Sequence, residues 1–470
     1  MDFTFWLDEQ SNEPLYLQLY QHIKEEIQYG NVGAGTKLPS IRRLSTHLSI
    51  SKNTIEAAYQ QLISEGYVES KERSGLYVVP VDGDIIPHQN IEQHLFEEDW
   101  NHEEKTYTYD FRQGRIDLDH FPFSIWRKLS NQSLLPEHKD TYLYGNPQGE
   151  PELRKEIAKY LYHSRGVNCS PGQIIIGAGI QQLLTLFGQL MDMKDKSVAI
   201  EDPAYDGAKM VFKSLGFNLH PIPLDDKGIN VDHLVRSDAK VVYVTPSHQF
   251  PYGMILPYAK RLELLQWMVN TNGYIIEDDY DGEFRYIGKP IPALQGLDSA
   301  GKVVYLGTFS KALMPALRMS YMVLPKNLFL TFKEKFSAYE PTVSKIHQKT
   351  MQLFMENGHW DRHIRKMRKI YQSKHLTLTS GIQNIMGNKV RIIGSQSGLH
   401  ILLKVNNNMS EGELIESAIR HEVKVYGTSK YWIDKHHTET PMILLGFGGL
   451  TEEQIYEGIV RLNKAWFHSS

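Results

Sequence analysis

Apolar residues recur at helical spacing through the first eighty residues, and they predict three helices followed by a hairpin. Along residues 14–29 the apolar stripe consists of Leu15, Leu19, Ile23 and Ile27. Gly30 would end this helix, and Pro39 with Ser40 would begin a second one. Ser51 would cap a third helix, and the later "YVESKERSGLYVVP" predicts two short strands around a Ser-Gly turn. This order is typical of a winged helix-turn-helix.

A different pattern follows in the second part of the chain. Short apolar runs alternate there with helical stretches, and the runs are "QIIIGAG", "SVAIEDPAY", "LHPIPL", "KVVYVTPSH", "YIIEDDYD", "KVVYLGTFSK" and "RMSYMVLP". Buried strands with helices between them imply a largely parallel sheet in an α/β domain. Long helical segments begin near Phe336, and a smaller mixed α+β region runs from "SGLHILLKV" to "MILLGFGGL".

Length and local composition suggest where the chain divides. A chain of 470 residues exceeds the size at which one hydrophobic core keeps growing, so at least two domains are expected. The stretch "VDGDIIPHQNIEQHLFEEDWNHEEK" is acidic and polar and lacks sustained periodicity, so we interpret residues 81–106 as a linker. The predicted domains are therefore residues 1–80 and 107–470.

Composition excludes several classes of protein. No apolar run approaches the length that spans a bilayer, and the N-terminal "MDFTFWLDEQ" is acidic, unlike a signal peptide. Cys169 is the single cysteine, which rules out an intrachain disulfide framework and a cysteine-rich zinc site. We expect a cytoplasmic protein with no membrane partner and no metal site. Because the net charge is −4, any contact with DNA must come from a local basic surface.

The predicted winged helix carries such a surface. No Asp or Glu occurs between Ile27 and Ile55, and the cations in this window are Lys37, Arg42, Arg43 and Lys52. Cations near helix starts, together with the N–H groups of helix N-termini, can bind DNA phosphates. A recognition helix inserts its first turn into the major groove of DNA. In the third helix this turn contains Ser51, Lys52, Asn53 and Thr54. The alternative is a solvated basic face on a small helical module.

Polar groups follow the ends of the predicted strands in the second domain, where open α/β sheets bind their ligands. The glycine-rich "GAGIQQLL" opens a helix, so the N–H groups around Gly179, Ile180 and Gln181 can hold a phosphate. Asp278 and Tyr280 end an apolar strand, where an isolated acid would be costly without a cationic partner.

The segment "VVYLGTFSKALMPALRMS" adds an amine to this group. Its turn holds Thr308, Ser310 and Lys311, and Arg318 adds a fixed cation suited to phosphate. A phosphate cradle, an acid, a phenol and a lysine together describe a pyridoxal 5′-phosphate site. The acid would keep the pyridine nitrogen protonated, the phenol would hydrogen-bond the 3′-oxygen, and the lysine would form a Schiff base. The alternative for Lys311 is a surface lysine on a strand-to-helix turn.

The segment "KLPSIRRLSTHLSISKNTIEAAYQQLISEGYVESKERSGLYV" resembles the DNA-binding domain of the GntR family of bacterial regulators. It contains the PS-x-R step, the S-[RK]-x-T helix start, the AY-x-x-L-x-x-EGY bridge and the R-x-G wing. The resemblance implies DNA contacts by Ser40, Arg42, Lys52, Asn53, Thr54, Arg73 and Gly75. Lys52 replaces the more frequent arginine, so it should still pair with phosphate but less well with a guanine edge.

Residues 107–470 resemble a fold-type-I aminotransferase, including "YLYGNPQGEPELRKEIAKYL" and "EDPAY". By this resemblance Lys311 forms the Schiff base, Asp278 and Tyr280 serve the pyridinium and the 3′-oxygen, and Tyr205 stacks on the ring. The implied phosphate ligands are Thr308, Ser310, Arg318 and, from the other subunit of a dimer, Tyr144.

A GntR-type domain followed by an aminotransferase-like domain resembles the MocR subfamily over almost the whole chain. The resemblance implies a cofactor-dependent transcription regulator that binds double-stranded operator DNA. It also implies a head-to-tail homodimer, in which the DNA-binding domain of one chain rests on the large domain of the other.

The chain departs from the family pattern where an effector would bind. The asparagine of the aminotransferase H-N-P-[TL]-G loop is missing from "TPSHQFPYG", so His248 or Gln249 is expected near the 3′-oxygen. The C-terminal "LLGFGGL" lacks the arginine that binds a substrate carboxylate. The γ-aminobutyrate-sensing branch is similar to this chain but uses arginines at the positions of Gly207 and Lys430, so we do not expect such an effector.

Our leading hypothesis is that pyridoxal 5′-phosphate itself is the effector, as in the PdxR branch that regulates synthesis of this cofactor. A second hypothesis is a sensor of another amino acid that uses Arg112, Arg115 or Lys430. A third, from a different class, is a working aminotransferase whose DNA-binding domain is only regulatory.

Overall fold

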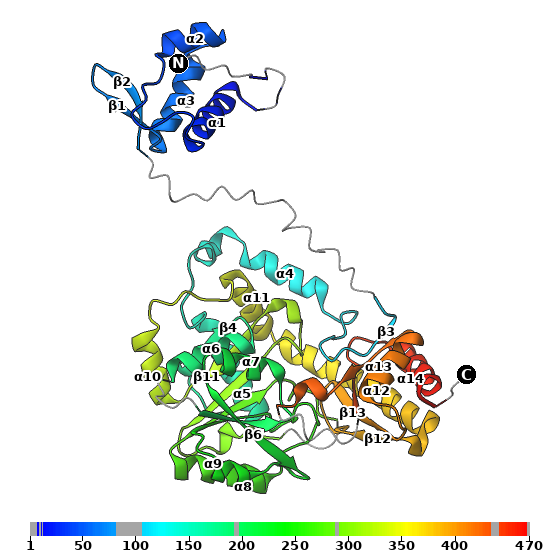
Figure 1. Ribbon diagram of the computed structural model, residues 1–470. Coiled ribbons are helices and arrows are strands. Elements are labelled where there is room, and N and C mark those ends of the chain that lie inside the picture. The colour runs from blue at the N-terminus through cyan, green and yellow to red at the C-terminus, as the bar shows by residue number, and fades with distance from the viewer. Residues whose placement is uncertain are drawn as a thin grey trace. The chain divides into compact units, whose positions relative to one another are not determined.

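The computed structural model describes residues 7–8, 11, 13–80, 106–191, 197–286, 291–433 and 441–467. The chain divides into two compact units, Met1–Glu104 and Lys105–Ser470 (Figure 1). Each unit has its own hydrophobic core. The predicted linker, residues 81–106, lies outside the described residues except for Thr106.

The N-terminal unit is the predicted three-helix module with a hairpin. Its elements are α1 (Leu15–Gln28), α2 (Ile41–Leu48), α3 (Lys52–Ser64), β1 (Val68–Lys71) and β2 (Gly75–Val78), and the two strands pair antiparallel. The side chain of Ser40 caps α2 by accepting from the Arg43 amide, and Ser51 caps α3 by accepting from the Thr54 amide. The expected winged helix-turn-helix is therefore confirmed.

The second unit is built on an eight-stranded sheet. From one edge to the other its strands are β4 (Ile174–Gly177), β11 (Ser320–Val323), β10 (Val303–Thr308), β9 (Tyr274–Asp279), β8 (Val241–Val244), β5 (Ser197–Asp202), β6 (Asn218–Asp225) and β7 (Gly228–Ile229). The pairs from β10 through β6 are parallel, whereas β11 pairs antiparallel with both β4 and β10. The sheet is thus largely parallel, as expected, with an antiparallel strand near one edge.

Helices cover both faces of this sheet because its strands are apolar on both sides. Ile276 of β9 packs with α6 (Ile180–Leu190), α7 (Asp206–Ser214) and α10 (Lys326–Lys335). Its neighbour Ile275 points to the other face, where α8 (Val231–Arg236) and α9 (Tyr258–Thr271) pack. The result is a three-layer arrangement in which the strand ends stay open for polar groups.

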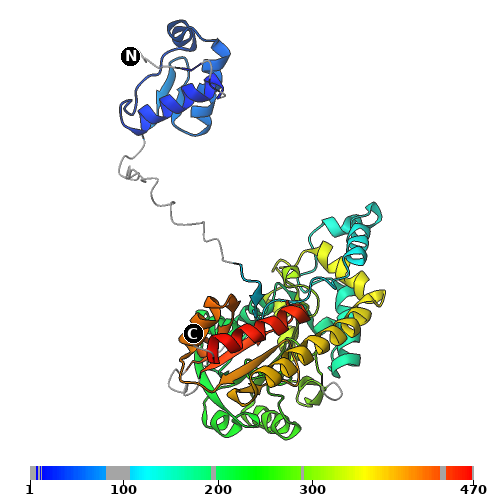
Figure 2. The ribbon, with the colours of Figure 1, turned by 90° about the vertical axis from the view of Figure 1, so that its right-hand side faces the viewer.

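A smaller region completes the second unit. Its antiparallel sheet has the order β12 (Val390–Ile393), β13 (His400–Val405), β16 (Met442–Gly446) and β15 (Tyr426–Gly427), and β3 (Tyr109–Asp110) pairs with β14 (Val423–Lys424). The helices in this part and around the large sheet are α4 (Phe123–Ser133), α5 (Pro151–Arg165), α11 (Lys345–Glu356), α12 (His359–Ile385), α13 (Glu411–Arg420) and α14 (Glu452–Phe467). The long α12 packs against α14 (Figure 2). Within the described residues, none of the helices has the length and apolar character needed to cross a membrane.

Candidate functional site

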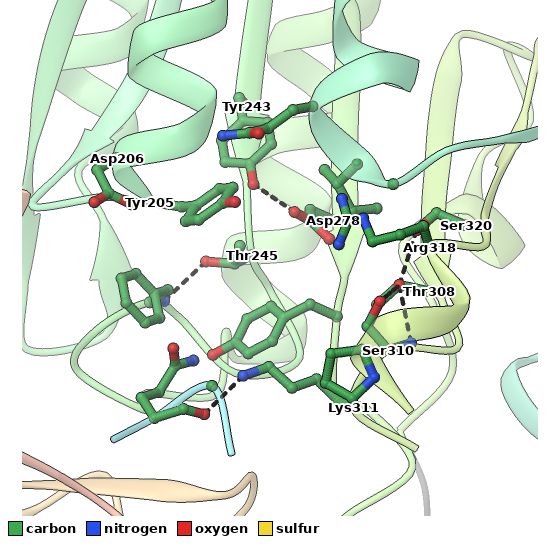
Figure 3. A pocket seen from close by; sticks show the side chains of 18 of the residues that line it. Tyr205, Asp206, Tyr243, Thr245, Asp278, Thr308, Ser310, Lys311, Arg318 and Ser320 are labelled. Atoms are coloured by element: carbon green, nitrogen blue, oxygen red, sulfur yellow. Dashed lines mark hydrogen bonds between the residues drawn. The ribbon is translucent and has the colours of Figure 1, made fainter. Parts of the chain in front are cut away.

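A cavity of ≈ 310 Å³ lies where the parallel strands of the large sheet end (Figure 3). The residues around it come from the ends of β8, β9 and β10, from the starts of α6 and α7, and from the segment before α4. Of the residues predicted from the sequence, those that line it are Gly179, Ile180, Gln181, Tyr205, Asp278, Tyr280, Thr308, Ser310, Lys311 and Arg318. Residues far apart in the sequence are therefore brought to one edge of the sheet.

Lys311 follows β10 and points into this cavity (Figure 3). Its Nζ donates a hydrogen bond to the carbonyl oxygen of Gln113 over 2.8 Å. Burial lowers the pKa of Lys311 to about 8, and the nearby Asp281 carboxylate opposes this effect. An amine that loses its proton this close to neutral pH is suited to act as a nucleophile.

Asp278, at the end of β9, is a buried acid with one unpaired oxygen. Tyr243 donates a hydrogen bond to its Oδ2 over 2.5 Å, while its Oδ1 has no partner within the described part of the chain. Burial raises the pKa of Asp278 to about 7, although the bond from Tyr243 acts in the opposite direction. A cationic N–H donor would satisfy Oδ1 and lower this pKa, so the residue fits a pyridinium nitrogen.

The start of α6 and the side chain of Arg318 form an anion site. Gly179 has φ +101°, and a Cβ atom at this position would lie 2.2 Å from Nη2 of Arg318. Only glycine therefore lets the guanidinium approach the helix N-terminus. The hydroxyl groups of Thr308, Ser310 and Ser320 form a hydrogen-bonded chain beside it, with distances of 2.8 and 3.1 Å. These donors fit a phosphate group.

Two of the predicted cofactor residues do not line the cavity. Tyr144 is 85% exposed, and its predicted contact belongs to a second subunit. His248 is buried outside the cavity lining and contacts the hydroxyl of Tyr280 through Nδ1 at 2.9 Å. Its neighbour Gln249 donates to the backbone carbonyls of Pro203 and Phe250. The side chain of Gln249 thus joins its own loop to the segment that follows β5.

The three effector candidates lie outside the cavity lining as well. Arg112 donates to the hydroxyl of Tyr426 over 3.0 Å, and Arg115 forms an ion pair of 3.1 Å with Asp110. The amine of Lys430 lies over the ring of the neighbouring tyrosine, 4.9 Å from its centroid.

Steric contacts also explain why position 207 carries no side chain. A Cβ atom on Gly207 would lie 2.4 Å from Cζ of Tyr205. An arginine there would therefore collide with the tyrosine ring as it stands in this cavity.

The predicted DNA contacts lie on the surface of the N-terminal unit. Apart from Thr54, which is half-buried, all of them are exposed, namely Lys37, Ser40, Arg42, Arg43, Ser51, Lys52, Asn53, Arg73 and Gly75. Lys37 is brought beside the hairpin, since it forms an isolated bridge with Tyr77 and its amine lies over that ring. The amine of Lys71, on β1, lies over the same ring, so these two cations are close in space. Their contacts with DNA remain predictions.

Several residues of the site could not be found from sequence motifs. The sequence analysis assigned no role to five residues that line the cavity, namely Gln113, Tyr243, Thr245, Phe250 and Tyr431. Of these residues, Tyr243 has the clearest signal in the sequence, because it places a polar hydroxyl group in the apolar run before "TPSH".

Comparisons with known proteins agree with both units. Residues 15–78 match the family of bacterial regulatory proteins of the gntR type, and residues 109–440 match the class I and II aminotransferases. A multiple substrate aminotransferase from Thermococcus profundus superposes with a TM-score of 0.70 and 26% identity, covering 77% of this chain and 92% of that one.

Three full-length regulators are similar along nearly the whole chain. The HTH-type transcriptional regulator YdeL of Bacillus subtilis is 44% identical over 99% of this chain and all of its own length. The probable rhizopine catabolism regulatory protein MocR of Rhizobium meliloti is 30% identical, covering 98% and 95% of the two chains. The pyridoxine biosynthesis regulator PdxR of Corynebacterium glutamicum is 28% identical, covering 93% of each.

The fold and the site thus define a class of protein, a DNA-binding transcription regulator whose second unit has the fold of a pyridoxal-phosphate-dependent aminotransferase. Within this class, the chain belongs to the MocR subfamily of GntR-type regulators. The resemblance identified in the sequence is therefore confirmed.

Proposed function

We propose that this regulator binds pyridoxal 5′-phosphate, responds to that cofactor itself, and controls genes of vitamin B6 synthesis. One observation carries the proposal: the cavity offers partners for every part of the cofactor but few for an additional carboxylate. Among its described lining residues the cations are Lys311 and Arg318, and both are expected to serve the cofactor.

The residues that would hold the cofactor follow from the geometry above. The start of α6 with Arg318 and the neighbouring hydroxyls would bind the phosphate, and Asp278 would accept from the ring nitrogen. When bound, the cofactor supplies an electrophilic carbonyl carbon and an electron-withdrawing ring. Lys311 would present its amine, Tyr205 would stack on the ring, and the hydroxyl of Tyr280 would hydrogen-bond the 3′-oxygen.

An amino-acid effector has weaker support. Arg115 is paired with Asp110, and Arg112 contacts Tyr426. Lys430 does not line the cavity, and its amine lies over the ring of Tyr431. The ring of Tyr205 occupies the space that a side chain at Gly207 would need. The relative PdxR is named for pyridoxine biosynthesis, which agrees with a cofactor-responsive regulator, and we extend that name to this chain only as part of the proposal.

The DNA side of the proposal uses the N-terminal unit. Its exposed cations and the N-termini of α2 and α3 would bind operator phosphates, and the first turn of α3 would enter the major groove. We further propose a head-to-tail homodimer, in which Tyr144, which is exposed here, reaches the phosphate site of the other subunit.

An operator titration of apo and cofactor-loaded protein at fixed salt tests the proposal. Without any amino acid, loading should change operator affinity by about 5- to 150-fold, the range of ordinary allosteric coupling. Lys311→Ala should reduce this response. Equal affinities, with a change only after an amino acid is added, would replace the cofactor sensor by an amino-acid sensor. Repeated turnover with a panel of amino acids would instead support a working aminotransferase.

A further inference from the structure

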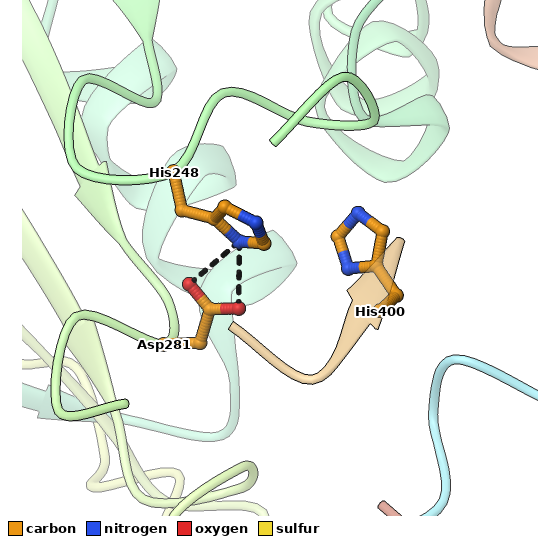
Figure 4. Close-up of side chains that lie close together, drawn as sticks. All are labelled: His248, Asp281 and His400. Atoms are coloured by element: carbon orange, nitrogen blue, oxygen red, sulfur yellow. Dashed lines mark hydrogen bonds and ion pairs between the residues drawn. The ribbon is translucent and has the colours of Figure 1, made fainter. Parts of the chain in front are cut away.

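A buried cluster outside the cavity lining has no role in the proposed function. It consists of His248, Asp281 and His400, each no more than 2% exposed, with polar atoms within 4.8 Å of one another (Figure 4). His248 connects this cluster to Tyr280, which lines the cavity.

Nδ1 of His248 is the centre of the cluster. It lies 2.9 Å from Oδ2 and 3.2 Å from Oδ1 of Asp281, and 2.9 Å from the hydroxyl of Tyr280. A carboxylate can only accept, so its contact with Nδ1 requires a hydrogen atom on that nitrogen. A nitrogen that carries this hydrogen cannot accept from Tyr280. Tyr280 therefore does not donate to Nδ1. Its oxygen can only share the Nδ1 hydrogen with Asp281, and its own hydrogen must point elsewhere.

Tyr280 retains this hydrogen. Burial, followed by the carboxylates of Asp281 and Asp278, raises the pKa of Tyr280 well above its usual value. Since the side chain lines the cavity, its hydroxyl hydrogen is free to be donated to a ligand there.

The neighbouring His400 does not donate a hydrogen bond to His248. His400 donates from Nε2 to the carbonyl of Pro251 over 3.0 Å, and burial lowers the pKa of His400 well below its usual value. His400 is thus neutral, and its Nδ1 is an acceptor without a partner among the described residues, as is Nε2 of His248. A Cβ atom on Gly398 would lie 2.0 Å from Cε1 of His248, so this glycine lets the ring lie where Nδ1 reaches Asp281.

We propose that Asp281 and His248 are a positioning pair that directs the hydroxyl hydrogen of Tyr280 into the cavity. Asp281 holds the hydrogen of His248 on Nδ1. The Nδ1–H group then faces the lone pairs of the Tyr280 oxygen, so Tyr280 cannot donate in that direction. Tyr280 then donates to the ring oxygen of a bound cofactor instead of accepting from it. This inference rests on the proposed function for the identity of the ligand, but not for the tautomer.

The pH dependence of the visible absorbance of the loaded protein tests the pair. A hydrogen bond donated to an ionised ring oxygen favours the deprotonated form, so losing it should move the midpoint to higher pH. We expect His248→Leu to raise this midpoint by about one pH unit. His248→Asn keeps an amide N–H near the place of Nδ1 and should stay close to wild type. In a Tyr280→Phe background, His248→Leu should add no further shift.

A shift of equal size with and without the Tyr280 hydroxyl would overturn the proposal, and so would no shift in His248→Leu. His375→Leu is a matched control, because His375 is also buried and its Nε2 is unpartnered, but its ring stacks on Tyr286. That variant should lower the thermal midpoint and leave the absorbance midpoint unchanged.

Nitrogen-15 NMR of apo-protein with labelled histidine tests the tautomer independently of the cofactor. We expect Nδ1 of His248 to carry the hydrogen in wild type and Asp281→Asn to weaken this preference. A wild-type hydrogen on Nε2 would overturn the proposal. If wild type shows no cofactor absorbance at all, the proposed function fails, whereas the NMR result still decides the role of Asp281.

Discussion

Tyr243 donates its hydroxyl hydrogen to Oδ2 of Asp278 over 2.5 Å and leaves Oδ1 of the same carboxyl group unpaired. The two residues lie on adjacent parallel strands, β8 and β9. The bond both orients the acid and favours its ionised form, so that the unpaired oxygen is available for a cation at the cavity.

Tyr243→Phe should weaken binding of pyridoxal 5′-phosphate. The variant removes a hydrogen bond to the charged form of Asp278, so the pKa of that acid rises and less carboxylate faces the cofactor. A bond of this kind contributes about 1.5–3 kcal/mol, so we expect at least a tenfold higher Kd. Titration of apo-protein with the cofactor, followed by absorbance, measures this.

Tyr305→Phe is the matched control for this change. The hydroxyl of Tyr305 donates to Oδ2 of Asp279 over 2.6 Å, and this acid does not line the cavity. The control should lower thermal stability but leave the Kd unchanged. An equal loss of affinity in both variants would contradict the role assigned to Asp278.

Gly179→Ala should remove the phosphate site. Its Cβ would lie 2.2 Å from Nη2 of Arg318, and its φ of +101° is strained for any residue with a side chain. We expect cofactor affinity to fall by at least tenfold, with little change for Gly172→Ala, where the nearest atom is 3.7 Å away. Comparable binding by the two variants would show that the phosphate lies elsewhere.

The stability of apo-protein should depend on pH through Lys311. Its pKa is about 8 in the folded chain and 10.5 in the unfolded chain, so the unfolded state binds more protons between these values. The free energy of unfolding should therefore rise with pH from about 8 to 10.5, by about 3 kcal/mol relative to Lys311→Met. Urea unfolding of both proteins across this range measures the difference. Parallel curves would mean that the amine is not buried.

Arg42→Ala and Lys52→Ala should each weaken operator binding and flatten its salt dependence. Each removes one expected phosphate contact, so the slope of log K against log salt should become shallower by about 0.9. Lys24→Ala is a suitable control because Lys24 is engaged with Glu65 at 3.1 Å. Fluorescence anisotropy at several salt concentrations gives the slopes. If neither variant changes affinity or slope, the docking of the winged helix is misassigned.

The sequence by itself determined the local elements and the identities of the central site residues. Helical spacing predicted α1, and the cap residues Ser40 and Ser51 predicted the starts of α2 and α3, because these signals depend on neighbours within a few residues. Buried strands were equally visible as apolar runs. Since parallel strands end at one edge of a sheet, motifs at those ends also placed Asp278, Lys311 and Arg318 in one cavity.

Only the tertiary structure decided which distant groups meet these residues. Lys311 contacts the carbonyl of Gln113, 198 residues earlier, and His248 contacts Asp281, 33 residues later. Backbone carbonyls carry no sequence signal, and a histidine in a loop is compatible with many partners. Hydrogen bonds, burial and tautomers depend on how separate elements pack together. The direction in which Tyr280 donates is therefore a property of the assembled fold and not of any segment.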